Sequence, residues 1–151
     1  MLYDMLCAQI VALAETDGWY VPLMSNAAAL LYESLSEINW AGFYLLRGDK
    51  LVLGPFQGKL ACVHIPLGKG VCGTAAATDS TQRVANVHDF PGHIACDAAS
   101  NAEIVIPIHK GGRVVGVLDI DSPVHCRFTP IDQAGLEAFV QALEETLEMD
   151  P

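Results

Sequence analysis

Two runs of branched apolar residues meet at a glycine pair in the sequence EIVIPIHKGGRVVGVLDIDS, residues 103–122. Glu103–Lys110 and Arg113–Asp121 have strand character, and Gly111-Gly112 is a typical two-residue hairpin turn. This stretch predicts an antiparallel β-hairpin, the clearest one in the chain, and with it a sheet built from antiparallel strands.

The second strand of this hairpin carries two carboxylates. Side chains alternate along a strand, so Val117, Asp119 and Asp121 lie on one face. The two like charges repel, a cost that is removed by solvent at the surface and by a bound cation in a pocket. Glu103 opens the partner strand and joins them if the register is favourable. A solvated strand end remains the alternative.

A long irregular segment precedes the hairpin. His88–Asn101 contains Pro91 and Gly92 and shows no sustained apolar period, so it predicts a loop of unusual length, and such loops in compact domains are commonly functional. Cys96 lies within it and is the candidate nucleophile. A tethered thiol close to clustered carboxylates suggests thiol chemistry on a small cationic substrate.

The region before this loop is rich in β-structure. Three strands are expected, with turns at Gly48-Asp49 and Gln57-Gly58: Trp40–Leu46, Leu51–Phe56 and Lys59–Ile65. A further strand is expected over Gln82–Val87. Connections this short produce antiparallel hairpins.

Strand alternation groups the side chains of these runs. Trp40, Gly42 and Tyr44 share one face of the first strand, and the same alternation groups Leu60, Cys62 and His64 on the third. Two aromatic residues separated by glycine suit a shallow aromatic box, while ordinary sheet packing is the alternative.

Helical patterns flank the strands. Residues 1–15 and a segment from Pro22 to about Glu37 have apolar stripes at helical spacing, Gly68–Thr74 leads into a short helix at Ala75–Thr78, and Thr129-Pro130 caps a last helix. The order predicts an α+β fold, with a central antiparallel sheet and helices packed on it.

Five cysteines without a CxxC pair predict free thiols with a catalytic or redox use, and no metal site is expected. Cys72 lies in the first turn of the short helix, where the helix dipole lowers a thiol pKa, although a small residue in a tight turn explains it as well. Cys7 is interpreted as a buried apolar residue. Cys126 has no assigned role.

The composition and charge of the chain limit the classes of partner that it can bind. The 151 residues suit one domain, residues 1–151, and a formal charge of −10 disfavours nucleic acid and anionic membranes as partners. No apolar run reaches the roughly 20 residues of a membrane span. The first basic side chain is Arg47, so we expect no secretory leader and a cytoplasmic location.

Several motifs together resemble the free methionine-(R)-sulfoxide reductases, single-domain enzymes of the GAF fold. The resemblance extends from about residue 20 to residue 145 and includes three cysteines, Cys62, Cys72 and Cys96. It is carried by five segments: Asn39–Tyr44, Leu53–Lys59, Gly70–Gly73, Gly92–Asp97 and Gly116–Ser122. Asn86 and Ala102 depart from the family pattern, and neither removes a proposed reactive group.

The resemblance implies a mechanism. Cys96 attacks the sulfoxide sulfur, methionine leaves, and the sulfenic acid condenses with Cys62, with Cys72 as a second possible resolving thiol. No bound cofactor is implied, since an external thioredoxin and NADPH system resets the enzyme. The matching substrate-binding residues are Glu103, Asp119, Asp121, Trp40 and Tyr44. A homodimer is possible.

Two other functions compete with this interpretation. One is a non-catalytic GAF module that binds a small ligand, and the other is a structural dimerisation domain whose thiols are incidental. The chemistry of the residues favours the enzyme. Sulfoxide reduction needs a thiolate, a proton for the departing oxygen and a second thiol to trap the sulfenic acid, and the cysteines and clustered acids of this chain suit these roles.

Overall fold

A six-stranded antiparallel sheet forms the centre of the computed structural model, which describes residues 1–93 and 99–150. The strand order is β3-β2-β1-β6-β5-β4, and every pair of neighbours is antiparallel. The strands are β1 Trp40–Arg47, β2 Lys50–Gly58, β3 His64–Pro66, β4 Gln82–Val84, β5 Ala102–Lys110 and β6 Arg113–Ser122.

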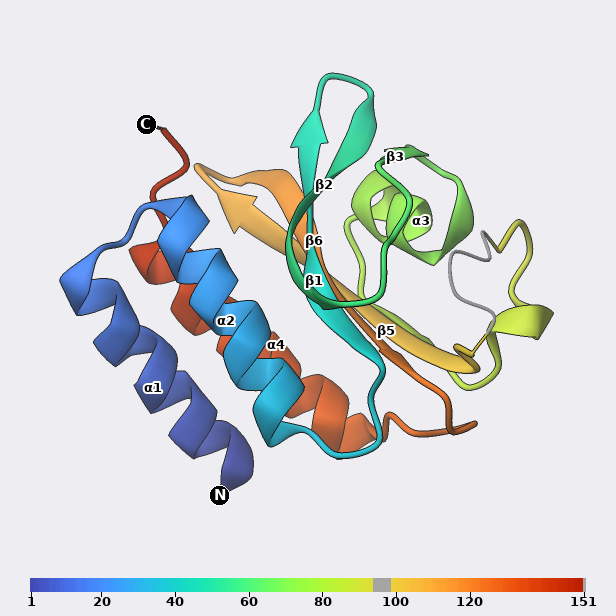
Figure 1. Cartoon of the computed structure of the whole chain (residues 1–151). Helices are drawn as coiled ribbons and strands as arrows, with labels where there is room; N and C mark the ends of the chain where they lie inside the picture. Colours follow the sequence, from blue (N-terminus) through green and yellow to red (C-terminus); the bar gives the residue numbers. More distant parts are fainter. Residues whose placement is uncertain (94–98, 151) are drawn as a thin grey trace.

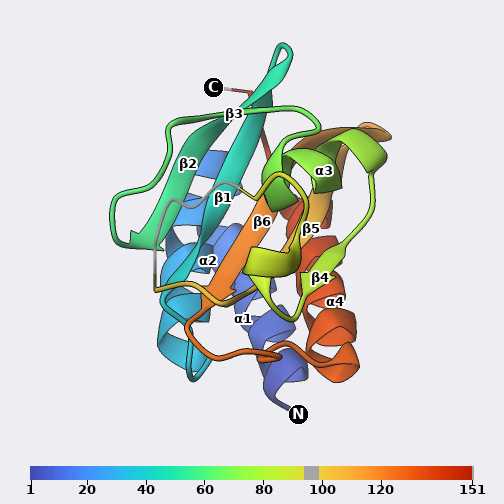
Figure 2. The same cartoon turned by 90° about the vertical axis from the view of Figure 1, so that its right-hand side faces the viewer.

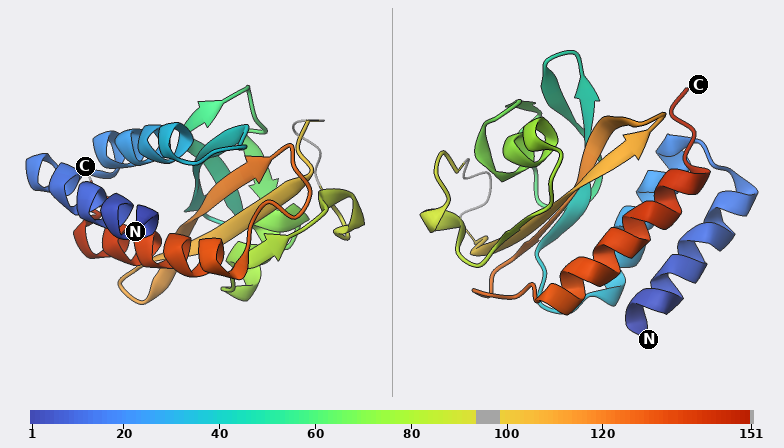
Figure 3. Two further views of the ribbon diagram at one scale, coloured as in Figure 1. Left: turned by 90° about the horizontal axis from the view of Figure 1, so that it is seen from below. Right: turned by 180° about the vertical axis from the view of Figure 1, so that it is seen from behind.

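Three long helices cover one face of this sheet (Figure 1). They are α1 Leu2–Thr16, α2 Tyr20–Ser34 and α4 Pro130–Thr146. Figure 3 shows α1 lying on the outside, beside α4. The main core lies between these helices and the sheet, and its largest fully buried side chains include Phe43, Phe139, Ile104 and Leu118. The predicted α+β architecture is confirmed.

The last helix begins as its sequence predicts. Thr129 is the N-cap, Pro130 follows in the first turn, and the Thr129 hydroxyl accepts a hydrogen bond from the backbone N–H of Asp132. The Asp132 carboxylate in turn accepts from the backbone N–H of Thr129, which completes a capping box.

The predicted hairpin is also present. Gly111 and Gly112 have φ of +62° and +74°, as a primed turn requires, and β5 pairs with β6 from Ala102 to Lys110. This pairing places Glu103 directly across from Asp121. The register left open by the sequence is therefore the one that joins the three acids.

The opposite face of the sheet is covered by one short helix and by loops. The helix α3, Gly70–Thr78, and a 3₁₀ helix, η1, at Val87–Asp89 lie in front of β5 and β6 in Figure 2. A second, smaller core joins α3 to this face through Val71, Ala75, Val105 and Val117. All the described candidate site residues lie on this side.

The prediction of a strand over Lys59–Ile65 was wrong for its first half. The strand β2 continues through Gln57-Gly58, which are not a turn, and Gly58 pairs with Trp40. Lys59–Val63 is a loop, and only His64–Pro66 forms β3. Leu60 and Cys62 therefore do not share a strand face with His64.

Other boundaries differ slightly. The second helix ends at Ser34 rather than near Glu37, and the strand expected to reach Val87 ends at Val84. Within residues 1–93 and 99–150, no helix is both long and apolar enough to cross a membrane.

Candidate active site

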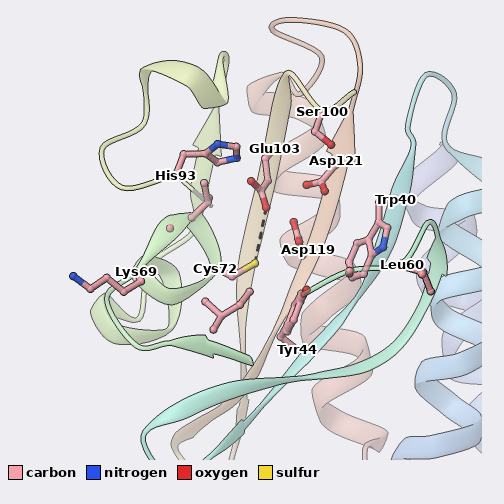
Figure 4. A pocket seen from close by; sticks show the side chains of 14 residues that line it. Trp40, Tyr44, Leu60, Lys69, Cys72, His93, Ser100, Glu103, Asp119 and Asp121 are labelled. Carbon is pink, nitrogen blue, oxygen red and sulfur yellow. Dashed lines mark hydrogen bonds between the residues drawn. The ribbon is translucent and has the colours of Figure 1, made fainter. Parts of the chain in front are cut away.

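Three carboxylates converge on the face of the sheet that α3 covers. Glu103 of β5 pairs with Asp121 of β6 across the two strands. Asp119 lies two residues before Asp121 in β6, so its side chain is on the same face (Figure 4). Glu103 and Asp119 are buried, and Asp121 is half-buried. The solvated strand end is thereby excluded for Glu103 and Asp119.

Burial changes the acidity of this group. Burial first, and the neighbouring Asp119 second, hold the pKa of Glu103 well above its usual range. Burial and the neighbouring Asp121 likewise raise the pKa of Asp119. Among the described residues, no lysine or arginine is ion-paired with Glu103 or Asp119. This acid cluster can therefore retain a proton or bind a cation.

Aromatic rings form the opposite wall of the same pocket. Trp40 and Tyr44 of β1 stack with ring centroids 5.9 Å apart, and Phe56 of β2 stacks on Trp40 at 5.2 Å. Gly42 makes this stack possible, because a Cβ there would lie 2.3 Å from the Phe56 Cβ and 2.9 Å from the Trp40 ring. The rings both pack on the sheet and line the pocket, so the two interpretations of the aromatic pair are compatible.

The polar ends of these rings hold the Lys59–Val63 loop. The indole Nε1 of Trp40 donates a hydrogen bond to the Lys59 carbonyl at 3.1 Å, and the Tyr44 hydroxyl donates to the Cys62 carbonyl at 2.9 Å. Leu60 and Ala61 of the same loop line the pocket. The aromatic wall thus also positions the segment that carries Cys62.

Cys72 lies in the pocket, and of the two interpretations left open by the sequence, a thiol with a lowered pKa is not the one that the structure supports. It is a buried free thiol in the first turn of α3, with its Sγ 3.9 Å from Oε2 of Glu103. Burial and three neighbouring carboxylates raise its pKa well above the usual range. Desolvation and negative charge outweigh the helix dipole here, so the thiolate is disfavoured.

The remaining cysteines differ in state and position. Cys62 is disulfide-bonded, while Cys7 and Cys126 are free thiols that do not line the pocket. Cys7 packs against the main core as expected but is only half-buried, and Cys126 is exposed. Cys96, the candidate nucleophile, lies outside the described residues.

The pocket is also lined by three polar residues that the sequence analysis did not single out: Lys69, His93 and Ser100. The Lys69 ammonium points away from the acids in Figure 4. Burial and the neighbouring His88 lower the pKa of His93. Ser100 is buried and its hydroxyl accepts from the Asn39 side chain at 3.2 Å. His93 belongs to the motif Gly92–Asp97 and was the one with a sequence signal.

Comparison with known proteins identifies the family. The GAF domain model matches residues 1–147. The free methionine-R-sulfoxide reductase of Escherichia coli is 57% identical over 136 residues, 90% of this chain and 82% of that protein. The chain belongs to the free methionine-(R)-sulfoxide reductases, a family of enzymes with the GAF fold.

Solved structures of this reductase family have the same fold. The reduced form of the Staphylococcus aureus enzyme has a TM-score of 0.93 at 53% identity, covering 97% of this chain and 95% of that one. The Neisseria meningitidis free methionine-R-sulfoxide reductase, solved in complex with its substrate, has a TM-score of 0.91 at 41% identity, covering 95% and 87%. The resemblance drawn from the sequence motifs is confirmed.

Proposed function

We propose that this chain reduces free L-methionine-(R)-sulfoxide to methionine. The observation that carries the proposal is the convergence of Glu103, Asp119 and Asp121 on a pocket whose other wall is Trp40 and Tyr44. Acids suit the polar ends of the substrate, and the aromatic wall suits its methyl and methylene groups. Membership of the reductase family supports the same substrate.

The proposed nucleophile is Cys96. Its thiolate attacks the sulfoxide sulfur and the oxygen is protonated. The oxygen then passes to the Cys96 sulfur as the bond between the two sulfurs breaks, so that methionine leaves and Cys96 becomes a sulfenic acid, with one proton taken up overall. The thiol of Cys62 then condenses with the sulfenic acid, releasing water and forming a Cys62–Cys96 disulfide. The resemblance carries the role of Cys96, and the disulfide-bonded state of Cys62 beside the pocket supports its role as resolving thiol.

Cys72 is the less suitable resolving thiol. It is buried and surrounded by carboxylates, which raise its pKa and leave little thiolate for attack. We therefore propose that Cys62 resolves the sulfenic acid and that Cys72 has a secondary part.

The acid cluster can serve the substrate in two ways. An ionised carboxylate accepts hydrogen bonds from the α-ammonium group, and a protonated one donates to the sulfoxide oxygen as it leaves. A methionine sulfoxide inside a polypeptide lacks that ammonium, so binding to these acids disfavours oxidised proteins. The preference for the R configuration at sulfur rests on the family alone.

The test of the nucleophile uses a mixture of the R and S sulfoxides of free L-methionine, with dithiothreitol as reductant. The wild-type protein should consume the R epimer only, and Cys96→Ser should consume neither epimer. Cys126→Ser is the matched control, because Cys126 is an exposed free thiol outside the pocket, and it should retain activity. Activity that survives in Cys96→Ser would refute the assigned nucleophile.

We further propose that a thioredoxin-type dithiol restores the reduced enzyme by attacking the disulfide of Cys62. Two large apolar side chains next to this cysteine are solvent-exposed, Leu60 at 90% and Val63 at 57%. Exposed apolar residues beside a disulfide suit the docking of a protein reductant. The reductant thiolate forms a mixed disulfide and its second thiol then resolves it.

Val63→Asp separates a protein reductant from a small one. The side chain does not line the pocket, so turnover driven by dithiothreitol should stay unchanged. Turnover driven by thioredoxin should need a higher thioredoxin concentration, by roughly tenfold if one apolar anchor is lost. Equal loss with both reductants would contradict a docking role. The cytoplasmic location and the homodimer stay predictions.

A further inference from the structure

Three metal-ligand groups from three different elements meet in the pocket. The Cys72 thiol comes from α3, and the carboxylates of Glu103 and Asp119 come from β5 and β6; one ligand atom of each lies within 4.8 Å of those of the other two. All three residues are buried. Figure 4 shows Cys72 directed at Glu103, with Asp119 beside them.

One atom of this group lacks a partner. The Oδ1 atom of Asp119 is buried and makes no hydrogen bond, although the residue is only 5% exposed. A buried carboxylate oxygen without a partner costs free energy, which a bound cation or proton removes. No lysine or arginine in the described part of the chain forms an ion pair with Glu103 or Asp119.

The donor set selects the kind of cation. A thiolate is a soft ligand that favours Zn²⁺ or Cd²⁺ over Mg²⁺ and Ca²⁺, which prefer oxygen ligands alone. Tetrahedral zinc takes Zn–S bonds of about 2.3 Å and Zn–O bonds of about 2.0–2.2 Å, so its donors lie roughly 3.5 Å apart. The Sγ of Cys72 lies 3.9 Å from Oε2 of Glu103, and all three ligand atoms lie within 4.8 Å of one another, so a bound cation would draw them together.

We propose that Cys72, Glu103 and Asp119 form a binding site for a thiophilic divalent cation, Zn²⁺ or its analogue Cd²⁺. Binding exchanges the thiol proton for the metal, so one proton is released from Cys72, and solvent completes the coordination. Cys72 is a free thiol while Cys62 is disulfide-bonded, so the site is intact in this form of the protein. The proposal rests on geometry alone and not on the proposed function.

The test follows cadmium binding in the absence of reductant. The protein carries Cys7→Ser and Cys126→Ser, so that Cys72 is the one remaining thiol among those described as free. Titration with Cd²⁺ should produce an ultraviolet sulfur-to-cadmium charge-transfer band that saturates at one cation per chain. Zn²⁺ should displace the cadmium and abolish the band.

Ligand variants in the same background decide the assignment. Adding Cys72→Ser should abolish the band. Asp119→Asn or Glu103→Gln should keep it and weaken cadmium binding by roughly tenfold or more, since even outer-shell changes cost that much at metal sites. Circular dichroism checks that each variant is folded. If one of the two carboxylate variants does not fold, the other one still provides the test.

The proposal is overturned by any of three results: no band in the parent protein, a band that persists after Cys72→Ser, or unchanged affinity in both carboxylate variants. The last would mean that cadmium contacts a lone thiol. These measurements involve no turnover, so an inactive protein that binds cadmium would contradict the proposed function and leave the cation site standing.

Discussion

Gly42 is the residue on which the aromatic wall depends. Replacing it with alanine inserts a Cβ between Trp40 and Phe56, at distances that real contacts do not tolerate. We expect Gly42→Ala to lower the free energy of unfolding by about 1–3 kcal/mol, the usual range for overpacking. Urea unfolding measures this, and an unchanged midpoint and slope would show that the stack can shift without cost.

The pKa of a single residue depends on neighbours that can be distant in the sequence. For Cys72, the sequence correctly indicated a helix start but not the sign of the pKa change, because the helix dipole is visible in a local motif and the facing carboxylates are not. Glu103 and Asp121 are separated by a whole hairpin in the sequence, and only the β5–β6 register brings them opposite each other. The sequence identified the three acids as candidate site residues, but only the folded structure shows that they come together.

Polar side chains, as well as the apolar core, hold the helices of this fold together. The Asp132 carboxylate closes the capping box of α4 and also accepts from the Tyr3 hydroxyl of α1 at 2.6 Å and from Arg127 at 3.2 Å. It therefore connects α1 to α4.

Two substitutions separate these roles of Asp132. Thr129→Ala removes the cap hydroxyl and should lower the free energy of unfolding by about 1 kcal/mol. Asp132→Asn should lower it further, because it also weakens the ion pair with Arg127 and the hydrogen bond from Tyr3. Urea unfolding of both variants checks the order, and equal losses would mean that the contacts of Asp132 with Tyr3 and Arg127 contribute nothing.

A histidine joins three elements at the far end of β5. The His109 ring contacts Asp79 at the end of α3 at 2.6 Å and Glu144 of α4 at 2.8 Å, and Figure 1 shows α3 and α4 on opposite sides of the sheet. The hydrogen bond with Asp79 is the main cause that raises the pKa of His109, with Glu144 adding to it against burial.

The raised pKa gives His109 a pH-dependent effect on stability. Its contribution is fully present below the unfolded pKa of about 6.5 and is lost as the pH rises through the higher folded pKa. The difference in melting temperature between wild type and His109→Gln should therefore be larger at pH 6 than at pH 9. Thermal unfolding at both values tests this, and a difference that grows with pH would contradict the assignment.

The error at Lys59–Val63 has a physical cause at this scale. The alternation of Leu60, Cys62 and His64 suits a strand, but the carbonyls of Lys59 and Cys62 accept hydrogen bonds from Trp40 and Tyr44 instead of from a neighbouring strand. Side-chain donors on a distant strand are invisible to a local pattern. The long helices and the hairpin were predictable because the apolar periods of the helices, the cap of α4 and the glycines of the hairpin turn are all local in the sequence.

The whole molecule divides its two faces between stability and chemistry. The helices α1, α2 and α4 bury the larger core on one face, while α3 and the connecting loops build the pocket on the other (Figures 1 and 2). The core under the helices holds the larger set of buried apolar side chains, and their burial can offset the cost of keeping buried acids and a thiol on the pocket side. The sequence predicted the α+β order and the antiparallel sheet, but not which face of the sheet the helices cover.

The central claim is that the pocket acids select the free amino acid, and it is tested by blocking the amine. We would compare kcat/KM for free L-methionine-(R)-sulfoxide and its N-acetyl derivative with the same reductant. Losing charge-assisted hydrogen bonds worth about 1.5–3 kcal/mol should reduce kcat/KM by roughly ten- to a hundredfold for the acetylated substrate. Equal values for the two substrates would contradict the account.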